Sequence, residues 1–372
     1  MQANQPPRVR DVIAELEAWA PPALQESYDN SGLLVGDRNA EVTGVLVSLD
    51  CTEEVVAEAV EKGANLIVSH HPIVFKGLKR FTGANYVERT VMAAIRQGIQ
   101  LYAIHTNLDN VADGVNQRLA SLVGCTLESQ RILRPKASVL MQVVVYVPQD
   151  HAEAVQQAVF DAGAGQIGNY DECGWSVQGQ GTFRPLTGAE PYTGQIGERE
   201  WADEVRLEVV VEPWKLSGVL QAMKAAHPYE EVAHSVWPLE NTLSNIGSGM
   251  VGELPEAMDE AAFLDRLKAT LGCGAVKHTR LLERPVRKVA VCGGSGGFLL
   301  GDAIRAGADV FVTSDFKYHE FFDADGRIVI ADVGHYESEW QTTDLILKRL
   351  NEKFPNFALH LAKANPNPIH YR

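Results

Sequence analysis

Apolar runs and helical patterns alternate along the first third of the chain. Residues 9–19 repeat apolar positions at helical spacing, which predicts a helix that Pro21 and Pro22 end. Further along, short runs rich in β-branched residues alternate with amphipathic segments. Strands are predicted at 45–49, 65–69 and 99–104, and helices at 52–61 and 86–96. This alternation indicates a mainly parallel sheet with helices on both faces.

The pattern changes after Gly124 and indicates a separate α+β segment. Its predicted order is strand, helix, strand, strand, helix, strand, which is the ferredoxin-like order. The strands are predicted at 139–147, 175–183, 205–211 and 232–238, and the helices at 151–162 and 214–226. We therefore interpret residues 138–240 as an inserted domain.

From about Gly249 the α/β alternation resumes, and this part of the chain repeats the first. Segments 45–71 and 289–315 align without a gap, and both read as strand, helix and strand. The matches at one constant offset are Val45 with Val289, Val47 with Val291, Ala59 with Ala303, Gly63-Ala64 with Gly307-Ala308, and Val68 with Val312. The predicted fold class is α/β: two similar βαβ-containing halves, residues 1–137 and 241–372, form one core that the ferredoxin-like insertion interrupts.

Composition and charge restrict the function more than the fold. Hydrophobic residues make up 45% and charged residues 22% of the 372 positions, as in ordinary soluble globular proteins. The net charge of −15 argues against broad affinity for nucleic acid or an anionic membrane. The five cysteines are scattered without C-x-x-C spacing, and neither a signal peptide nor a membrane span is recognisable. We therefore expect a soluble, cytoplasmic protein with reduced thiols.

His70 and His71 end the predicted strand 65–69 and are the first candidates for chemistry. Binding sites of α/β proteins lie at the carboxyl ends of strands. Neighbouring strand residues point to opposite faces, so the pair is also compatible with one core and one surface histidine. In the second half, the equivalent strand ends in Ser314 and Asp315. Polar residues at the same strand end in both halves predict a site between the halves.

Further candidates follow two other predicted strands. His105 and Asp109 come after the strand at 99–104, and His335 and Glu339 come after a strand at 328–331. Residues four apart share a helix face, so His335 and Glu339 can point at one cation, although such pairs are also common on helix surfaces. Asp109 is compatible either with a carboxylate that bridges two cations or with a helix N-cap.

Five of these side chains form a candidate metal site: His70, His71, Asp109, His335 and Glu339. Their nitrogen and oxygen donors suit Zn, Mn, Fe or Co better than Ca, and the absence of cysteine argues against a structural zinc site. A single catalytic metal ion with an open coordination position usually binds fewer than five side chains. We therefore expect two divalent metal ions per chain that share a bridging water or hydroxide.

Catalytic roles are less well defined by the sequence. His105 and His319 are candidates for moving a proton, because an unperturbed imidazole has a pKa of ~6.5. Lys317, Tyr318 and His319 are equally compatible with a supporting role around the metals. The glycine-rich stretch 293–297 is compatible with a loop that cradles a phosphate at a helix N-terminus or with a tight strand-to-helix turn.

Several motifs together resemble those of a known family. They are Asp29-Asn30-Ser31-Gly32-Leu33, Ser69-His70-His71-Pro72, His105-Thr106-Asn107-Leu108-Asp109, Thr313-Ser314-Asp315 through His319, and Gly334-His335 with Ser338-Glu339. The chain resembles the NIF-three-like dinuclear metal centre hexameric family, also named GTP cyclohydrolase I type 2 homologues. The insertion resembles the PII/CutA-like domain of the longer members, on the motifs Gly165 to Tyr170, Gly179 to Pro185 and His227 to Val232.

The resemblance carries expectations beyond those drawn from the residues. It implies that the metal ligands are the same five side chains, with Ser314 standing where some relatives have glycine. It also implies a toroidal homohexamer whose metal sites face an internal cavity. The leading hypothesis is a metal-dependent hydrolase of a small nucleotide-like or phosphorylated compound. The alternative is a non-catalytic metal-binding or regulatory assembly in which the insertion senses a small ligand.

Overall fold

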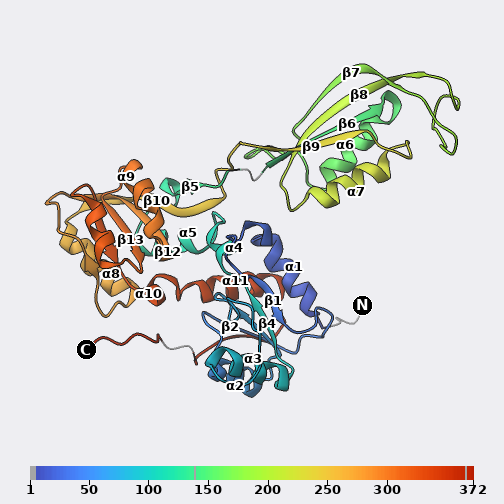
Figure 1. The fold of residues 1–372 in the computed structure, drawn as a ribbon. Helices are drawn as coiled ribbons and strands as arrows, with labels where there is room; N and C mark the ends of the chain where they lie inside the picture. Colours follow the sequence, from blue (N-terminus) through green and yellow to red (C-terminus); the bar gives the residue numbers. More distant parts are fainter. Residues whose placement is uncertain (1–5, 138–139, 365–366) are drawn as a thin grey trace. The chain divides into compact units, whose positions relative to one another are not determined.

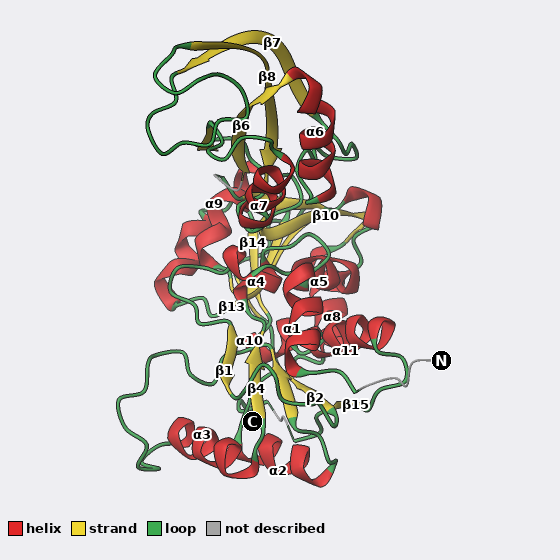
Figure 2. Cartoon of the chain, turned by 90° about the vertical axis from the view of Figure 1, so that its right-hand side faces the viewer, coloured by secondary structure: helices red, strands yellow, loops and turns green. Residues whose placement is uncertain are grey.

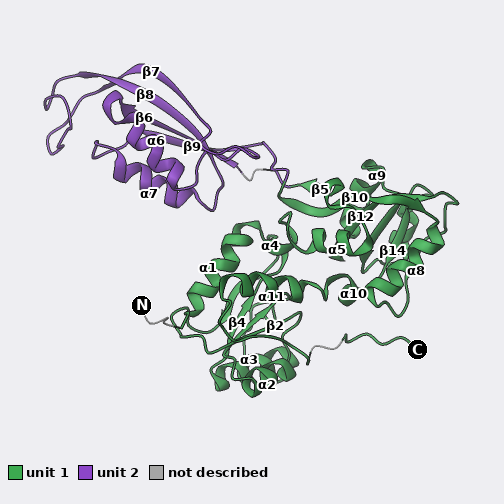
Figure 3. Ribbon diagram, turned by 180° about the vertical axis from the view of Figure 1, so that it is seen from behind, with its two compact units in different colours: residues 1–135, 245–372 green, residues 136–244 purple. Residues whose placement is uncertain are grey.

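The chain divides into two compact units, of which unit 1 contains two sheets and unit 2 contains one. The computed structural model describes residues 6–137, 140–364 and 367–372. Unit 1 comprises residues 1–135 and 245–372, and unit 2 comprises residues 136–244 (Figure 3). The predicted start of the inserted domain, residue 138, lies outside the described residues.

The first sheet of unit 1 has five strands in the order β1-β4-β3-β2-β15 (Figure 1). Their bounds are Gly32–Val35 for β1, Gln100–Ala103 for β4, Leu66–Ser69 for β3, Val45–Ser48 for β2 and Leu359–Leu361 for β15. Helices α2 (Glu53–Glu61) and α3 (Tyr86–Gln97) lie side by side beneath this sheet (Figure 2). Helices α1 (Val9–Trp19) and α11 (Thr342–Lys353) pack together on the other side of the sheet (Figure 1).

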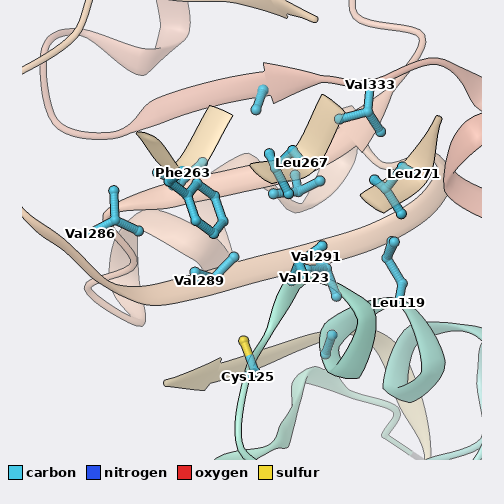
Figure 4. Packing of buried hydrophobic residues seen from close by; sticks show 14 of the residues in the cluster. Leu119, Val123, Cys125, Phe263, Leu267, Leu271, Val286, Val289, Val291 and Val333 are labelled. Atoms are coloured by element: carbon cyan, nitrogen blue, oxygen red, sulfur yellow. The ribbon is translucent and has the colours of Figure 1, made fainter. Parts of the chain in front are cut away.

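The second sheet of unit 1 has six strands in the order β11-β14-β13-β12-β10-β5. Their bounds are Lys277–His278 for β11, Val329–Asp332 for β14, Val310–Ser314 for β13, Val286–Ser295 for β12, Gly247–Met258 for β10 and Arg131–Pro135 for β5. Helices α5 (Val115–Val123) and α8 (Glu260–Leu271) pack on one face of this sheet. There Phe263, Leu267 and Leu119 meet the strand valines (Figure 4). Burial of this apolar surface stabilises the second sheet and its helices.

The predicted internal repeat is confirmed in the two sheets. Strand β2 pairs in parallel with β3 through Val45 and Leu66, and β12 pairs with β13 through the equivalent Val289 and Val310. The helix-to-strand corner also repeats, because Gly63 and Gly307 adopt left-handed φ angles of 69° and 70°. Helix α9 (Leu300–Arg305) and a preceding 3₁₀ turn occupy the place that α2 holds in the first half.

The sequence predicted a mainly parallel sheet, but both sheets of unit 1 also contain antiparallel strand pairs. Strands β1 and β11 pair antiparallel at one edge of their sheets, and β10 and β5 add two further antiparallel pairs. The halves also interlock, since β15 from the end of the chain joins the first sheet. These edge strands lie outside the repeated strand-helix-strand segment, so the repeat could not predict them.

Unit 2 has the predicted ferredoxin-like order. Its elements are β6 (Leu140–Pro148), α6 (Ala152–Asp161), β7 (Gly174–Phe183), β8 (Glu200–Val211), α7 (Leu216–Ala226) and β9 (His234–Leu239). The antiparallel sheet has the order β7-β8-β6-β9, and valines of α6 and α7 pack against it. The predicted first residue of β6, residue 139, lies outside the described residues.

Two sequence expectations can be compared directly with the fold. The five cysteines all lie in the described part of the chain, and each is a free thiol. Among the described residues, we find no helix with the length and apolarity that a membrane crossing requires.

Candidate metal centre

The candidate ligands gather inside unit 1 at the ends of strands from both sheets. His70 and His71 directly follow β3, and the backbone N–H groups of both still donate to the strand beside it. The one-turn helix α4 (Thr106–Asp109) follows β4 and carries Asp109. The short helix α10 (His335–Glu339) follows β14, the equivalent strand of the other sheet. The repeat thus places one short ligand-bearing helix after the third strand of each half.

Two groups of three side chains could each hold one ion, and Glu339 belongs to both. In the first group, Glu339 Oε2 lies 3.0 Å from His71 Nε2 and 3.0 Å from His335 Nε2. In the second group, His70 Nε2 lies 3.6 Å from Asp109 Oδ1 and 3.9 Å from Glu339 Oε1. The two oxygens of one buried carboxylate therefore face two separate sets of donors.

Every histidine of the cluster is oriented by a hydrogen bond at Nδ1. His70 lies 2.8 Å from the carbonyl oxygen of Ile104. The other three have carboxylate partners: His71 with Asp50 at 2.8 Å, His105 with Asp29 at 2.7 Å, and His335 with Asp315 at 2.6 Å. Such partners fix the tautomer with the proton on Nδ1 and leave Nε2 free to bind a metal.

The sequence analysis missed this supporting role of the three aspartates. Asp29 and Asp315 lie in the motifs that resemble the family, but nothing in the sequence pairs them with His105 and His335. Asp50 follows β2, the strand next to the one that His71 follows. Its position at a neighbouring strand end was the signal that could have identified it.

Two buried atoms of the cluster indicate that a cation belongs there. His70 Nε2 and Asp109 Oδ1 are both buried, and neither forms a hydrogen bond with any described residue. Leaving buried polar atoms without a partner costs about 1–3 kcal/mol each. A metal ion held by both atoms and by Glu339 would satisfy them, so the residues fit a metal with nitrogen and oxygen ligands.

The electrostatics of the cluster support the same interpretation. Burial opposes a charge on His71, but hydrogen bonds to carboxylates outweigh it and raise the pKa of His71 to about 10. At His335, nearby carboxylates likewise outweigh burial and raise the pKa to about 11. Burial and the charge of Glu339 raise the pKa of Asp109 well above its usual value. Protons on His71, His335 and Asp109 thus balance the negative charge of the buried carboxylates. A metal ion must displace these protons to bind.

The two candidates for proton transfer lie in different surroundings. His105 joins His70 and His71 in a third group of possible ligands, so its imidazole lies at the cluster. His319 lies on an exposed 3₁₀ segment, Tyr318–Ala324, where its ring contacts Tyr318 and Phe322. None of the three groups includes His319. This segment turns away after β13, so the order of residues along the chain did not predict the position of His319.

The glycine-rich stretch 293–297 is not a phosphate-cradling loop. Its N–H groups donate to side chains of the protein: Gly293 to Asn116, Gly294 to Ser338, and Gly296 to Thr313. Gly294 has a φ of 61°, and a Cβ at this residue would overlap Glu339 Oε1. The glycines therefore let the end of β12 approach the cluster closely.

Comparison with known proteins agrees with the resemblance of the sequence motifs. The family model for Duf34/NIF3 (NGG1p interacting factor 3) matches residues 7–368. A GTP cyclohydrolase 1 type 2 homolog of Halalkalibacterium halodurans is 39% identical over 87% of this chain and 87% of its own length. A relative with the same name from Bacillus subtilis is 36% identical over 97% of both chains.

Solved structures show the same relationship. A Bacillus cereus protein related to NIF3 has a TM-score of 0.85 and 37% identity, covering 99% of this chain and 100% of its own. A Staphylococcus aureus protein has a TM-score of 0.78 and 31% identity over the full length of both chains. With a family match over nearly the whole sequence and relatives above 30% identity, the chain belongs to the Duf34/NIF3 family.

Proposed function

We propose that the protein is a metal-dependent hydrolase that acts on a small nucleotide-like or phosphorylated compound through a dinuclear centre. The observation that carries this proposal is the position of Glu339, whose two oxygens face different sets of donors. The proposed ligands are His70, His71, Asp109, His335 and Glu339. Zn, Mn, Fe and Co all suit this mixture of nitrogen and oxygen donors.

Each side chain has a role that follows from its contacts. Two divalent ions, when bound, would supply a water of lowered pKa and polarise the bond under attack. Asp50 and Asp315 hold His71 and His335 in position through their Nδ1 atoms. His105 is our candidate for proton transfer, because Asp29 fixes its ring and it groups with His70 and His71. His319 is the weaker candidate, since its ring contacts lie outside the cluster.

The substrate class rests on the names of the relatives. Homologues at 33–39% identity are named GTP cyclohydrolase 1 type 2 homolog, which supports a nucleotide-like substrate. A name shared across a family is weaker support than the chemistry of a site. The screen should therefore include phosphoesters and cyclic nucleotides as well as GTP.

The test combines metal analysis with turnover. The purified protein should bind two ions per chain under saturating supply and hydrolyse at least one compound of the screen. Glu339→Ala should lose both ions and activity, His70→Ala should lose one ion and activity, and His319→Ala should keep both ions. Full occupancy without turnover across the screen would overturn the hydrolase and favour the non-catalytic regulatory assembly. Fewer than two ions would contradict the dinuclear centre.

We also propose that the chain assembles as a homohexamer, as the family resemblance implies. In such an assembly, subunit contacts could cover large exposed side chains such as Phe298 and Phe322 in unit 1 and Trp175 and Trp201 in unit 2. Native mass spectrometry tests the stoichiometry directly. A monomer at micromolar concentration would contradict the proposal.

A further inference from the structure

A cavity in unit 2 has no part in the metal centre. Its volume is about 590 Å³, and small-molecule sites typically measure roughly 300–1,000 Å³.

Three aromatic rings form much of the wall of the unit 2 cavity. The Tyr229 ring lies with its centroid 5.8 Å from that of Phe183 and 6.0 Å from that of Tyr192. These residues come from the end of β7, the loop before β8 and the loop before β9. The faces of aromatic rings attract cations within about 6 Å of the centroid.

Glu204 of β8 places a buried carboxylate in the same wall. The residue is only 8% exposed, and its Oε1 accepts a hydrogen bond of 3.2 Å from the Tyr229 hydroxyl. Its Oε2 lies against Gly181, where a Cβ would overlap it. Within the described part of the chain, no donor or cation pairs with Oε2. Oε2 is not among the buried polar atoms of the described residues, so it is open to the cavity and can accept a hydrogen bond from a ligand.

The remaining charged side chains of the cavity wall are mostly acidic, which also favours a cationic ligand. Glu230 and Glu231 add two carboxylates, and Arg184 is the one cationic side chain among the lining residues. Arg184, Glu230 and Glu231 are all exposed, and Glu204 is the buried charged residue among those that line the cavity. The interior of the cavity is therefore acidic and aromatic.

We propose that this cavity binds a small organic amine that is protonated at neutral pH. Its ammonium group donates to Glu204 Oε2 and faces the rings of Tyr229 and Tyr192, and its apolar body fills the rest of the cavity. A charge-assisted hydrogen bond and cation–π contacts supply the recognition. This site is independent of the proposed hydrolase, because all of its residues belong to unit 2.

Calorimetry on the full-length protein with phenethylamine as the probe tests the proposal. The neutral analogue 2-phenylethanol has nearly the same shape, and we expect it to bind at least about tenfold more weakly. Glu204→Gln should weaken phenethylamine binding by a similar factor. Asp203→Asn is the matched control, since the neighbouring residue on β8 does not line the cavity. Equal binding of the amine and the alcohol, or no binding of the amine at millimolar concentration, would overturn the proposal.

A second pair of variants tests the role of the ring. Tyr192 is 51% exposed, so its replacement should leave the fold intact. Tyr192→Phe keeps the ring and should retain binding, whereas Tyr192→Leu should weaken it about fivefold. Equal affinities of these two variants would contradict the cation–π contact. Metal content should be unchanged in all these variants, so failure of the amine site leaves the hydrolase proposal standing.

Discussion

Glu339 is the residue on which the candidate metal centre most depends. It is 3% exposed, and its carboxylate lies within 4 Å of three histidines. Burial raises the pKa of this carboxyl, but His335 and the other histidines outweigh it and hold the pKa well below the usual value. Glu339 therefore remains ionised and can offer one oxygen to each group of donors.

Replacing Glu339 and Asp109 should separate the two ion positions. Glu339→Gln removes a ligand from both groups, so we expect loss of both ions. Asp109→Asn removes a ligand from the second group alone, so we expect one ion to remain. Each affinity loss should exceed the ~10–100-fold typical of mutating a residue that supports a ligand. Elemental analysis after saturation and gel filtration measures the stoichiometry, with His319→Ala as the control.

At the residue scale, the sequence indicates candidate ligands but not the partners that orient them. His70, His71, Asp109, His335 and Glu339 follow strands that their β-branched runs make recognisable. Which residue orients each imidazole depends on distances across the fold, as between Asp50 and His71. Sequence order alone does not carry that information.

At the scale of elements, helices and central strands were predicted more accurately than edge strands. Helix α1 has the predicted bounds Val9–Trp19, because its apolar spacing and the prolines after it define both ends. Strands β5, β11 and β15 were missed, since they are short and their residues are largely partly or fully exposed. Their pairing partners lie far away in the sequence, so local patterns do not indicate them.

The close approach of β12 to α10 predicts a specific effect of a methyl group at Gly294. Gly294→Ala adds a Cβ that would overlap Glu339 Oε1 and lie 3.3 Å from His335 Cε1. We expect weaker metal binding together with lower stability. Gly307→Ala is the matched control, because Gly307 has a similar φ of 70° and no atom within 4 Å of the added Cβ.

Both variants should lose about 1–2 kcal/mol of unfolding free energy from left-handed backbone strain. Only Gly294→Ala should also change the metal affinity, as measured by competition with a chelator. Equal metal affinity in the two variants would show that β12 does not constrain the cluster.

The loop before β9 should make unit 2 sensitive to acid through His227. Its Nε2 donates to the carbonyl oxygen of Tyr146, and its Nδ1 accepts from the N–H of Tyr229. Burial lowers the pKa of His227. The unfolded state therefore binds a proton more readily, and the stability from this residue is present above pH ~6.5 and lost as pH falls through the lowered pKa.

We expect thermal unfolding of unit 2 to shift to lower temperature as the pH falls below ~6.5. His227→Gln removes this titration, so its unfolding temperature should be lower at neutral pH but vary less across the same range. Circular dichroism at several pH values measures both slopes. Identical slopes in the two proteins would exclude His227 as the acid-sensitive group.

At the scale of the whole molecule, the two units have separate cores and separate candidate sites. All five candidate ligands belong to unit 1, and the amine cavity belongs to unit 2. Ligand binding stabilises the folded state in which the site exists. Each unit should therefore respond to its own ligand.

Hydrogen exchange with and without metal tests this separation. Metal at a hundredfold excess over its dissociation constant stabilises the folded state by about 2.7 kcal/mol per site. We expect slower exchange in β3, β4, α4 and α10 after metal is added, because these elements carry or precede the ligands. Exchange in β6, β8 and α7 should be unchanged, and Glu339→Gln should abolish the effect in unit 1. Equal protection of both units would show that metal binding in unit 1 also stabilises unit 2.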